Sequence, residues 1–227
     1  MTDIKENLKK VGERVARAAR KVNRCPRSIR VMAVTKRHSI DAIQSAAAAG
    51  QRDFGENFLQ EAAEKIENLQ DSGLVWHFIG RIQSNKTRSI AQLFDWVHTV
   101  DRLKIAQRLS EQRPEDHPRL NICLQVNVAS DQVKGGVSPE HVSELVEEVR
   151  SLPKLRLRGL MCIPPQSDVL DEQRGYFARV RSLFTELASD QKDWDTLSMG
   201  MSGDLESAVF EGSTFVRIGT AIFGPRT

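Results

Sequence analysis

The amino-acid sequence predicts an α/β protein built as a single (β/α)8 TIM barrel. Short apolar runs alternate with helical patterns between residues 31 and 218, and no series of hairpin turns interrupts this alternation. Such alternation indicates βαβ units and a parallel sheet. Eight candidate strands in a chain of 227 residues suit a small barrel, because barrels of about 200–250 residues often form one domain.

A basic helix is expected before the first strand, over residues 4–24. Its apolar side chains recur at steps of three or four, which places them on one face, while lysines and arginines fill the other. Cys25 and Pro26 mark its end. We expect residues 1–25 to pack across the bottom of the barrel, with their basic face in solvent. Residues 1–227 are expected to form one domain. The apolar stripe consists of Ile4, Leu8, Val11, Val15, Ala18 and Val22.

In the first half of the chain, runs of apolar residues that predict strands alternate with patterns that predict helices. Val31 to Thr35 is rich in β-branched residues and predicts a buried strand, and the alanine-rich helix after it ends at Gly50. Gly80 ends the third strand. We expect strands at 31–35, 52–55, 75–79 and 94–100, and helices at 40–49, 57–69, 86–92 and 102–111.

The second half continues the rhythm. Residues 120–128 are almost continuously apolar, which is typical of a strand buried on both faces. Pro164 and Pro165 stop the sixth strand, and the seventh is marginal. We expect strands at 120–128, 155–162, 196–198 and 214–218, and helices at 139–152, 170–189 and 205–210. The rival fold, a doubly wound sheet, normally carries a glycine-rich turn after its first strand, whereas Thr35 to His38 contains no glycine.

Composition excludes several classes of protein. Hydrophobic residues make up 40% and charged residues 28%, so the chain is too apolar to be disordered. No apolar run approaches the ~18 residues of a membrane span, and the N-terminus lacks the apolar core of a secretory signal. The three cysteines show no CxxC spacing, which argues against a disulfide framework or a zinc site and suits a cytoplasmic protein. A net charge of +3 does not by itself indicate nucleic-acid binding.

Residues that follow the strands are the candidates for function, because barrels carry their sites at the carboxyl ends of the strands. Lys36 follows the first strand, where burial or neighbouring cations can keep an amine neutral for Schiff-base formation with an aldehyde. A surface lysine at a strand end is the simpler interpretation. Glu56 and Asn57 follow the second strand and also suit the first turn of a helix.

The third strand contains His77, on the face shared by Val75 and Ile79. A single histidine there is more often a hydrogen-bonded core residue than a metal ligand, and no second ligand lies at zinc spacing. We therefore expect no metal. Lys86 follows in the next loop, either as a cation at the mouth or as a helix-surface lysine.

Two glycine-containing loops close the chain. Residues 198–204 (SMGMSGD) hold two glycines and two serines before a short helix, and Gly219-Thr220 follows the eighth strand. Barrels often bind phosphate between these two loops, although both could be ordinary turns. Arg217, near the end of the eighth strand, lies on the opposite face from its neighbours Val216 and Ile218, and periodicity does not decide which face is inside.

With these residues in view, the chain resembles the pyridoxal-phosphate (PLP) homeostasis protein family, the YggS/PROSC group, over nearly its whole length. The resemblance implies an alanine-racemase-type barrel, PLP fold type III, without the racemases' C-terminal β domain. The matching segments are AVTKRHS (33–39), FGENFLQEA (54–62), WHFIGRIQSNK (76–86), HTVDR (98–102), LRGLMCIP (157–164), LSMGMSGDLE (197–206) and VRIGTAIFG (216–224).

The resemblance also implies roles for individual residues. Lys36 would carry PLP as an internal aldimine, and Arg217 would face the pyridine nitrogen. Asn57 and His77 would lie beside the ring. Lys134 is matched weakly to a family lysine that takes part in PLP transfer or in a second PLP contact, because its surroundings vary in such proteins. Gly203 stands where relatives often have a polar residue. The phosphate would be held by Ser202, Gly219 and Thr220.

The same resemblance favours a PLP carrier over an enzyme. Racemases with this barrel use a second base, a tyrosine from an additional domain, and the one tyrosine here, Tyr176, is expected on an outer helix. We therefore expect a protein that holds PLP as a Schiff base and takes part in PLP homeostasis, with PLP-dependent apoenzymes as candidate partners. The alternative is a slow PLP-dependent amino-acid racemase or lyase that uses His77 or a water as its second base.

A third interpretation is an interaction module, in which the basic helix in residues 1–30 docks RNA or an acidic protein. These residues contain no Phe, Trp or Tyr, so the aromatic platform typical of nucleic-acid binding is missing. We expect neither nucleic-acid nor membrane binding. A monomer is expected, because the domain that builds the racemase dimer is not predicted.

Overall fold

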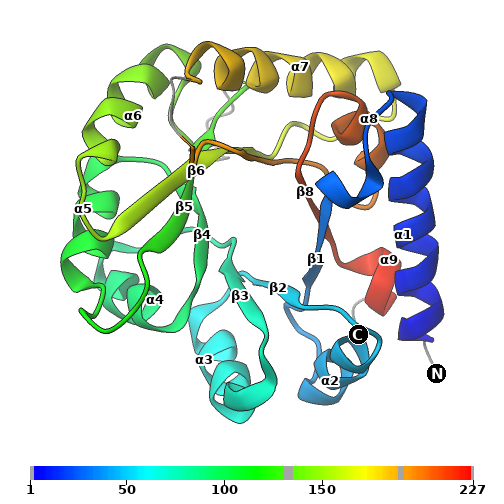
Figure 1. Cartoon of the computed structure of the whole chain (residues 1–227), viewed down its shortest axis with the longest axis horizontal. Coiled ribbons are helices and arrows are strands. Elements are labelled where there is room, and N and C mark those ends of the chain that lie inside the picture. The colour runs from blue at the N-terminus through cyan, green and yellow to red at the C-terminus, as the bar shows by residue number, and fades with distance from the viewer. Residues whose placement is uncertain (1–2, 130–134, 189–191, 226–227) are drawn as a thin grey trace.

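The computed structural model describes residues 3–129, 135–188 and 192–225, and eight parallel strands in it close into a barrel (Figure 1). Each strand pairs with its neighbours in chain order, and β8 pairs with β1. The predicted (β/α)8 barrel is thereby confirmed. The strands are β1 (Arg30–Val34), β2 (Asp53–Glu56), β3 (Val75–Phe78), β4 (Trp96–Val100), β5 (Leu120–Val126), β6 (Leu155–Cys162), β7 (Thr196–Ser198) and β8 (Phe215–Ile218).

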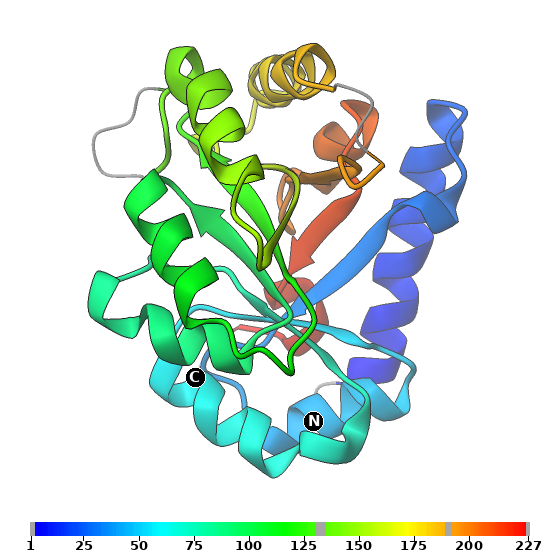
Figure 2. The same cartoon turned by 60° about the vertical axis from the view of Figure 1, so that its left-hand side comes forward.

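Helices surround the strands on the outside, as both views show (Figures 1 and 2). Each expected helix is present within about three residues of its expected ends, and α9 is an addition that the sequence patterns did not predict. The helices are α1 (Ile4–Lys21), α2 (Ile40–Ala48), α3 (Leu59–Asn68), α4 (Thr87–Leu93), α5 (Leu103–Gln112), α6 (Val142–Arg150), α7 (Leu170–Glu186), α8 (Leu205–Phe210) and α9 (Thr220–Phe223).

Helix α1 lies along the side of the barrel, beside α8, α9 and α2, and not across its bottom as expected (Figure 1). Asp3 caps it by accepting a hydrogen bond from the Glu6 N–H at 2.9 Å. Its buried stripe includes Val11 and Val15. The physical reason for its position is that α8 and α9 have only six and four residues, so they leave apolar surface on this side of the barrel that α1 covers.

The core has two layers. The larger one fills the space between strands and helices, with side chains such as Phe54, Phe94 and Phe177. The smaller one lies inside the barrel and includes Met32 and Trp96. Because alternate residues of each strand face inward, this inner layer closes the barrel below its carboxyl-terminal mouth. Within the described residues, no helix is long and apolar enough to cross a membrane.

Candidate functional site

A cavity of about 700 Å³ opens at the carboxyl-terminal end of the barrel. Its wall comes from the ends of β1, β3 and β8 and from the loops after β2, β6 and β7. Such a position is where barrels place their sites. Six of the seven predicted site residues line it, namely Lys36, Asn57, Ser202, Arg217, Gly219 and Thr220.

Lys36 reaches the cavity because the strand alternation continues past the end of β1. Thr35 is fully buried on the outer side of the barrel, where its hydroxyl donates a 2.6 Å hydrogen bond to Oε1 of Glu56. The next residue, Lys36, therefore faces inward and is partly exposed. Arg37 then turns the chain with a φ of +62°, a left-handed conformation that is uncommon for a residue other than glycine.

Asn57 enters the cavity from the loop after β2. Its Oδ1 is buried and has no hydrogen-bond partner among the residues that the structure describes. Its backbone packs against Gly80, where a Cβ atom would lie 2.0 Å from the Asn57 carbonyl oxygen. Only glycine permits this approach. Asn57 therefore brings an unused acceptor to a wall of the cavity, which a ligand donor can satisfy.

The loop after β7 is shaped by its own hydrogen bonds. Gly200 has a φ of +97°, and the Met201 N–H donates to Oδ1 of Asp204 at 2.5 Å. Burial raises the pKa of the Asp204 carboxyl, although that N–H and the charge of Arg217 lower it. A Cβ atom on Gly203 would meet nothing within 4 Å, so the loop is open toward a ligand at that point.

Helix α1 supports the same loop from outside the barrel. The Arg14 guanidinium donates to the Ser202 carbonyl oxygen at 3.2 Å and forms a bidentate ion pair with Glu206, at 2.8 and 2.9 Å. Because the Ser202 carbonyl is held from behind, the loop is fixed while the Ser202 side chain stays at the cavity wall.

The loop after β8 faces the β7 loop across the cavity mouth. Gly219 packs against β1, because a Cβ there would lie 3.4 Å from the Val34 carbonyl oxygen. Helix α9 starts at Thr220, and the N–H groups of Thr220 and Ala221 have no acceptor within this helix. The two glycine-containing loops therefore meet at one cavity, with two hydroxyls and N–H groups that have no acceptor within α9, a combination suited to an anion.

Arg217 points into the barrel, which settles the orientation that periodicity left open. Its guanidinium donates to the carbonyl oxygens of Ser198 and Cys162, at 2.6 and 2.8 Å, and to the Ser198 hydroxyl at 3.0 Å. The residue is only 4% exposed, and burial lowers its pKa. An arginine still keeps its charge, so a fixed cation forms part of the cavity floor.

His77 is not brought to the cavity. It is fully buried inside the barrel, where its Nε2 lies 2.9 Å from Oδ1 of Asp53 and its Nδ1 lies 3.0 Å from Nε2 of His98. Ile79, two residues further along the chain, is the cavity-lining residue of this segment. The resemblance implies that His77 lies beside a ring, but the structure does not place it among the residues that line the cavity, because its side chain lies one inward-facing layer deeper. It is the hydrogen-bonded core histidine of the simpler interpretation.

The two further lysines have different outcomes. Lys86 ends a 3-10 helix (Ser84–Lys86) after β3 and is not among the residues that line the cavity. Lys134 lies outside the described residues.

Sequence reasoning missed one wall of the cavity, the loop between β6 and α7. Residues 163–168 line it, and so does Gln173 of α7. In the sequence, Pro164 and Pro165 predict only the end of the sixth strand. The signal available was the length of this connection after a barrel strand, since long loops at the carboxyl ends of strands commonly form the site.

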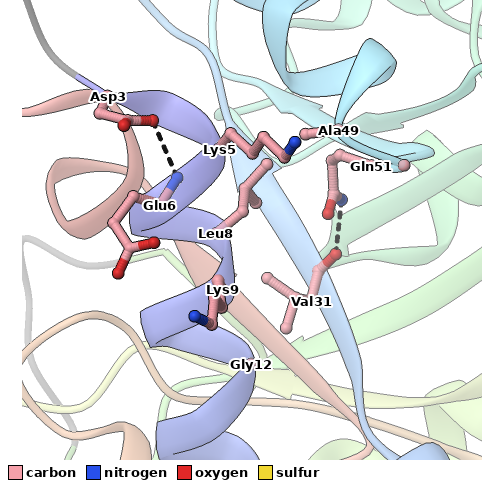
Figure 3. Close-up of a pocket in the computed structure, with 10 residues that line it drawn as sticks. Asp3, Lys5, Glu6, Leu8, Lys9, Gly12, Val31, Ala49 and Gln51 are labelled. Carbon is pink, nitrogen blue, oxygen red and sulfur yellow. Dashed lines mark hydrogen bonds between the residues drawn. The ribbon is translucent and has the colours of Figure 1, made fainter.

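A second pocket, of about 590 Å³, lies outside the barrel, between α1, Val31 of β1 and the segment after α2 (Figure 3). Gln51 donates to the Val31 carbonyl oxygen at 2.7 Å at its edge. Lys5 and Lys9 are matched there by the carboxylates of Asp3 and Glu6, so the pocket has no excess charge. It contains none of the predicted site residues, and we assign the candidate site to the barrel mouth.

Comparison with known proteins agrees with this geometry. The family model for the alanine racemase N-terminal domain matches residues 6–227. The chain is 55% identical to the pyridoxal phosphate homeostasis protein of Pseudomonas aeruginosa, over 100% of this chain and 97% of that one. It is 46% identical to the protein of the same name from Escherichia coli K12, over 100% and 98%. The chain belongs to the pyridoxal phosphate homeostasis protein family.

A solved structure of a relative carries the cofactor. The structure of PipY from Synechococcus elongatus with PLP bound is 38% identical in sequence and superposes with a TM-score of 0.84. The match covers 97% of this chain and all of PipY. PipY, which has this barrel fold, therefore binds PLP.

Proposed function

We propose that this protein binds PLP in the cavity at the barrel mouth and takes part in its intracellular supply. The observation that carries the proposal is that Lys36 and the two glycine-containing loops open onto one cavity. PLP combines an aldehyde, a pyridine ring and a phosphate, and the cavity offers an amine, a buried cation and an anion site in the same space. PLP bound to PipY and the names of the relatives support the assignment.

The residues present fit this ligand. Ser202, Thr220 and the N–H groups of the two loops suit a phosphate, and the unpaired Oδ1 of Asn57 can accept a hydrogen bond near the ring. Arg217 supplies a positive charge for the pyridine side. A cation there disfavours protonation of the ring nitrogen and so weakens the ring as an electron sink. We leave His77 out of the binding residues.

Lys36 is the proposed point of covalent attachment. A neutral lysine amine can attack an aldehyde carbon, so that a carbon–nitrogen double bond replaces the carbon–oxygen double bond and the oxygen leaves with both amine protons as one water molecule. Its partly exposed position lets an aldehyde approach from solvent. A protein that supplies PLP must exchange bound PLP with the surrounding solution.

We propose a supply role without substantial turnover. Tyr176 lies on α7, on the outside of the barrel, and is not among the cavity-lining residues. His77, the second base of the alternative reading as a slow racemase or lyase, lies below the cavity and is paired with Asp53 and His98. We place the protein in the cytoplasm as a monomer, with PLP-dependent apoenzymes as recipients.

The test is the absorption spectrum of the protein with added PLP, before and after borohydride reduction, for wild type and Lys36→Ala. We expect a visible band in the wild type that reduction fixes to Lys36, and no fixed adduct in Lys36→Ala. Lys9→Ala, in the second pocket, serves as the matched lysine control and keeps the adduct. An adduct that persists in Lys36→Ala refutes the attachment site. Substantial turnover of an amino acid that is abolished in Lys36→Ala refutes the supply role.

A further inference from the structure

A buried ammonium group lies directly behind Lys36. The Lys65 side chain, on α3, is only 5% exposed, and its Nζ donates to three oxygens. These are the Thr35 carbonyl at 2.7 Å, Oε1 of Glu56 at 2.7 Å and Oε1 of Glu61 at 2.6 Å. All three ammonium protons therefore have acceptors, so the group is fixed in direction as well as in position.

Two of these acceptors belong to residues that immediately precede residues of the cavity wall. Thr35 immediately precedes Lys36, and Glu56 immediately precedes Asn57. The Thr35 hydroxyl also donates to Oε1 of Glu56 at 2.6 Å, which joins the ends of β1 and β2. The Lys65 ammonium is thus tied to the residues before both Lys36 and Asn57.

The other side of Lys36 is held by the same cluster. Oε1 of Glu61 accepts a hydrogen bond from the Arg37 backbone N–H at 2.5 Å while it is paired with Lys65. Arg37 has the left-handed φ of +62°. Such a conformation persists in a residue other than glycine when its surroundings hold it. Through this carboxylate the cluster fixes the turn that follows Lys36.

Charge balance makes the cluster dependent on Lys65. Glu56 is fully buried, and burial raises the pKa of its carboxyl, while hydrogen bonds from Lys65 and Thr35 lower it. Without the ammonium, two carboxylates would lie close together with no counter-charge. The cost of removing two charges from water largely cancels their attraction, so a buried ion pair adds little to stability. The pair instead holds the groups around it in one arrangement.

We propose that Lys65, together with Glu56 and Glu61, is a positioning residue that fixes the backbone on both sides of Lys36 and so aims its amine into the cavity. The proposal rests on the proposed function, since it concerns the reaction of Lys36 with PLP. Lys65, Glu56 and Glu61 are not among the residues that line the cavity, and the cluster acts through the backbone at Thr35 and Arg37.

The experiment compares two ligands. Stopped-flow absorbance follows covalent bond formation with PLP, and calorimetry gives the Kd of pyridoxine 5′-phosphate, which has the ring and phosphate but no aldehyde. In Lys65→Met we expect bond formation to slow by about 10- to 100-fold, because small misplacements of a reacting group have effects of this size. The Kd of pyridoxine 5′-phosphate should change by less than about 2-fold, since its binding does not use the Lys36 amine.

Arg113→Met is the matched control. Arg113 is also a buried cation, 4% exposed, and it donates to backbone carbonyls of Ala91, Phe94 and Pro118 at the opposite end of the barrel. The Arg113→Met variant loses a similar set of hydrogen bonds, so it shows how much general destabilisation of the fold slows the reaction. We expect Arg113→Met to form the bond at the wild-type rate. Equal slowing in Arg113→Met and Lys65→Met would overturn the proposal.

Glu61→Ala keeps the test decisive if Lys65→Met does not fold. The Glu61 side chain is 26% exposed, so its removal disturbs the core less, and it still frees the Arg37 N–H. We expect slower bond formation here too. A wild-type rate in a folded Lys65→Met or Glu61→Ala protein overturns the proposal, and so does an equal loss of pyridoxine 5′-phosphate affinity. If the wild type itself forms no covalent bond with PLP, the proposed function is refuted, and this result differs from one in which only the variants behave unexpectedly.

Discussion

Nδ1 of His77 lies 3.0 Å from Nε2 of His98 inside the barrel, below the cavity. Nε2 of His77 lies 2.9 Å from an Asp53 carboxylate oxygen, so it carries the proton and donates. Nδ1 of His77 is then the acceptor, and Nε2 of His98 donates to it. Nδ1 of His98 is left as a bare acceptor, in agreement with its lack of a partner among the described residues. This assignment takes both rings as neutral, because burial lowers the pKa of each.

Acid should destabilise the fold through this histidine pair. Burial lowers the pKa of His77 and lowers that of His98 well below 6.5. Their contribution to stability is therefore present above pH 6.5 and is lost as the pH falls below it, because the unfolded chain binds protons that the native state does not. We expect the free energy of unfolding to decrease by about 1.4 kcal/mol per pH unit for each histidine that stays neutral.

Urea unfolding between pH 7.5 and pH 5 measures this slope. His98→Gln keeps a donor for Nδ1 of His77 and does not titrate, so its slope should be smaller than that of the wild type by the share of one histidine. An identical slope in His98→Gln would contradict the assignment of the acid sensitivity to this pair.

Gly80→Ala should damage both the fold and the cavity. The added Cβ would lie 2.0 Å from the carbonyl oxygen of Asn57 and 2.7 Å from its carbonyl carbon, so the Asn57 backbone must shift. We expect a loss of about 1–3 kcal/mol in the free energy of unfolding and weaker PLP binding. Denaturant unfolding and PLP titration measure the two effects.

Gly12→Ala provides the opposite case. Gly12 lies within α1, and a Cβ there would meet nothing within 4 Å. Alanine favours a helix over glycine by about 1 kcal/mol, so we expect a small gain in stability and unchanged PLP binding. If Gly80→Ala matched Gly12→Ala in both measurements, the close packing against Asn57 would be disproved.

Ser202→Ala tests the assignment of the phosphate. A hydrogen bond to a charged group contributes about 1.5–3 kcal/mol, so losing the hydroxyl should weaken PLP binding by about 10-fold or more. Pyridoxal, which lacks the phosphate, should bind Ser202→Ala and wild type equally well. Spectroscopic titration with both ligands measures the ratio. Equal weakening of pyridoxal binding would place the phosphate elsewhere.

Much of the barrel could be predicted from local patterns. The run from Val31 to Thr35 showed that a strand ends just before Lys36, and a barrel places that end at the functional face. Residues 198–204 and Gly219-Thr220 were recognised from glycines and hydroxyls followed by a helix or a strand end. These features depend on neighbours in the chain, so they can be read without the fold.

The depth of a side chain could not be predicted in this way. Alternation placed His77 and Ile79 on one face correctly, but only the register of β2, β3 and β4 shows that His77 lies against Asp53 and His98 while Ile79 reaches the cavity. Likewise, alternation left Arg217 with two possible directions until its contacts with Ser198 and Cys162 fixed one. Each of these contacts joins residues more than 18 positions apart in the chain.

The sequence by itself determined the order of the elements and the class of fold, because both depend on spacing along the chain. It pointed to Lys36 as the reactive lysine only through the resemblance to a family. The tertiary structure alone decided that Lys65, 29 positions after Lys36, stands behind it and holds the residues on either side. A lysine on an amphipathic helix is ordinarily solvated, and nothing in its local pattern distinguishes Lys65. Its burial follows from the tertiary fold, which brings the Thr35 carbonyl and the Glu56 carboxylate to an ammonium group that Glu61, one turn earlier in α3, also pairs.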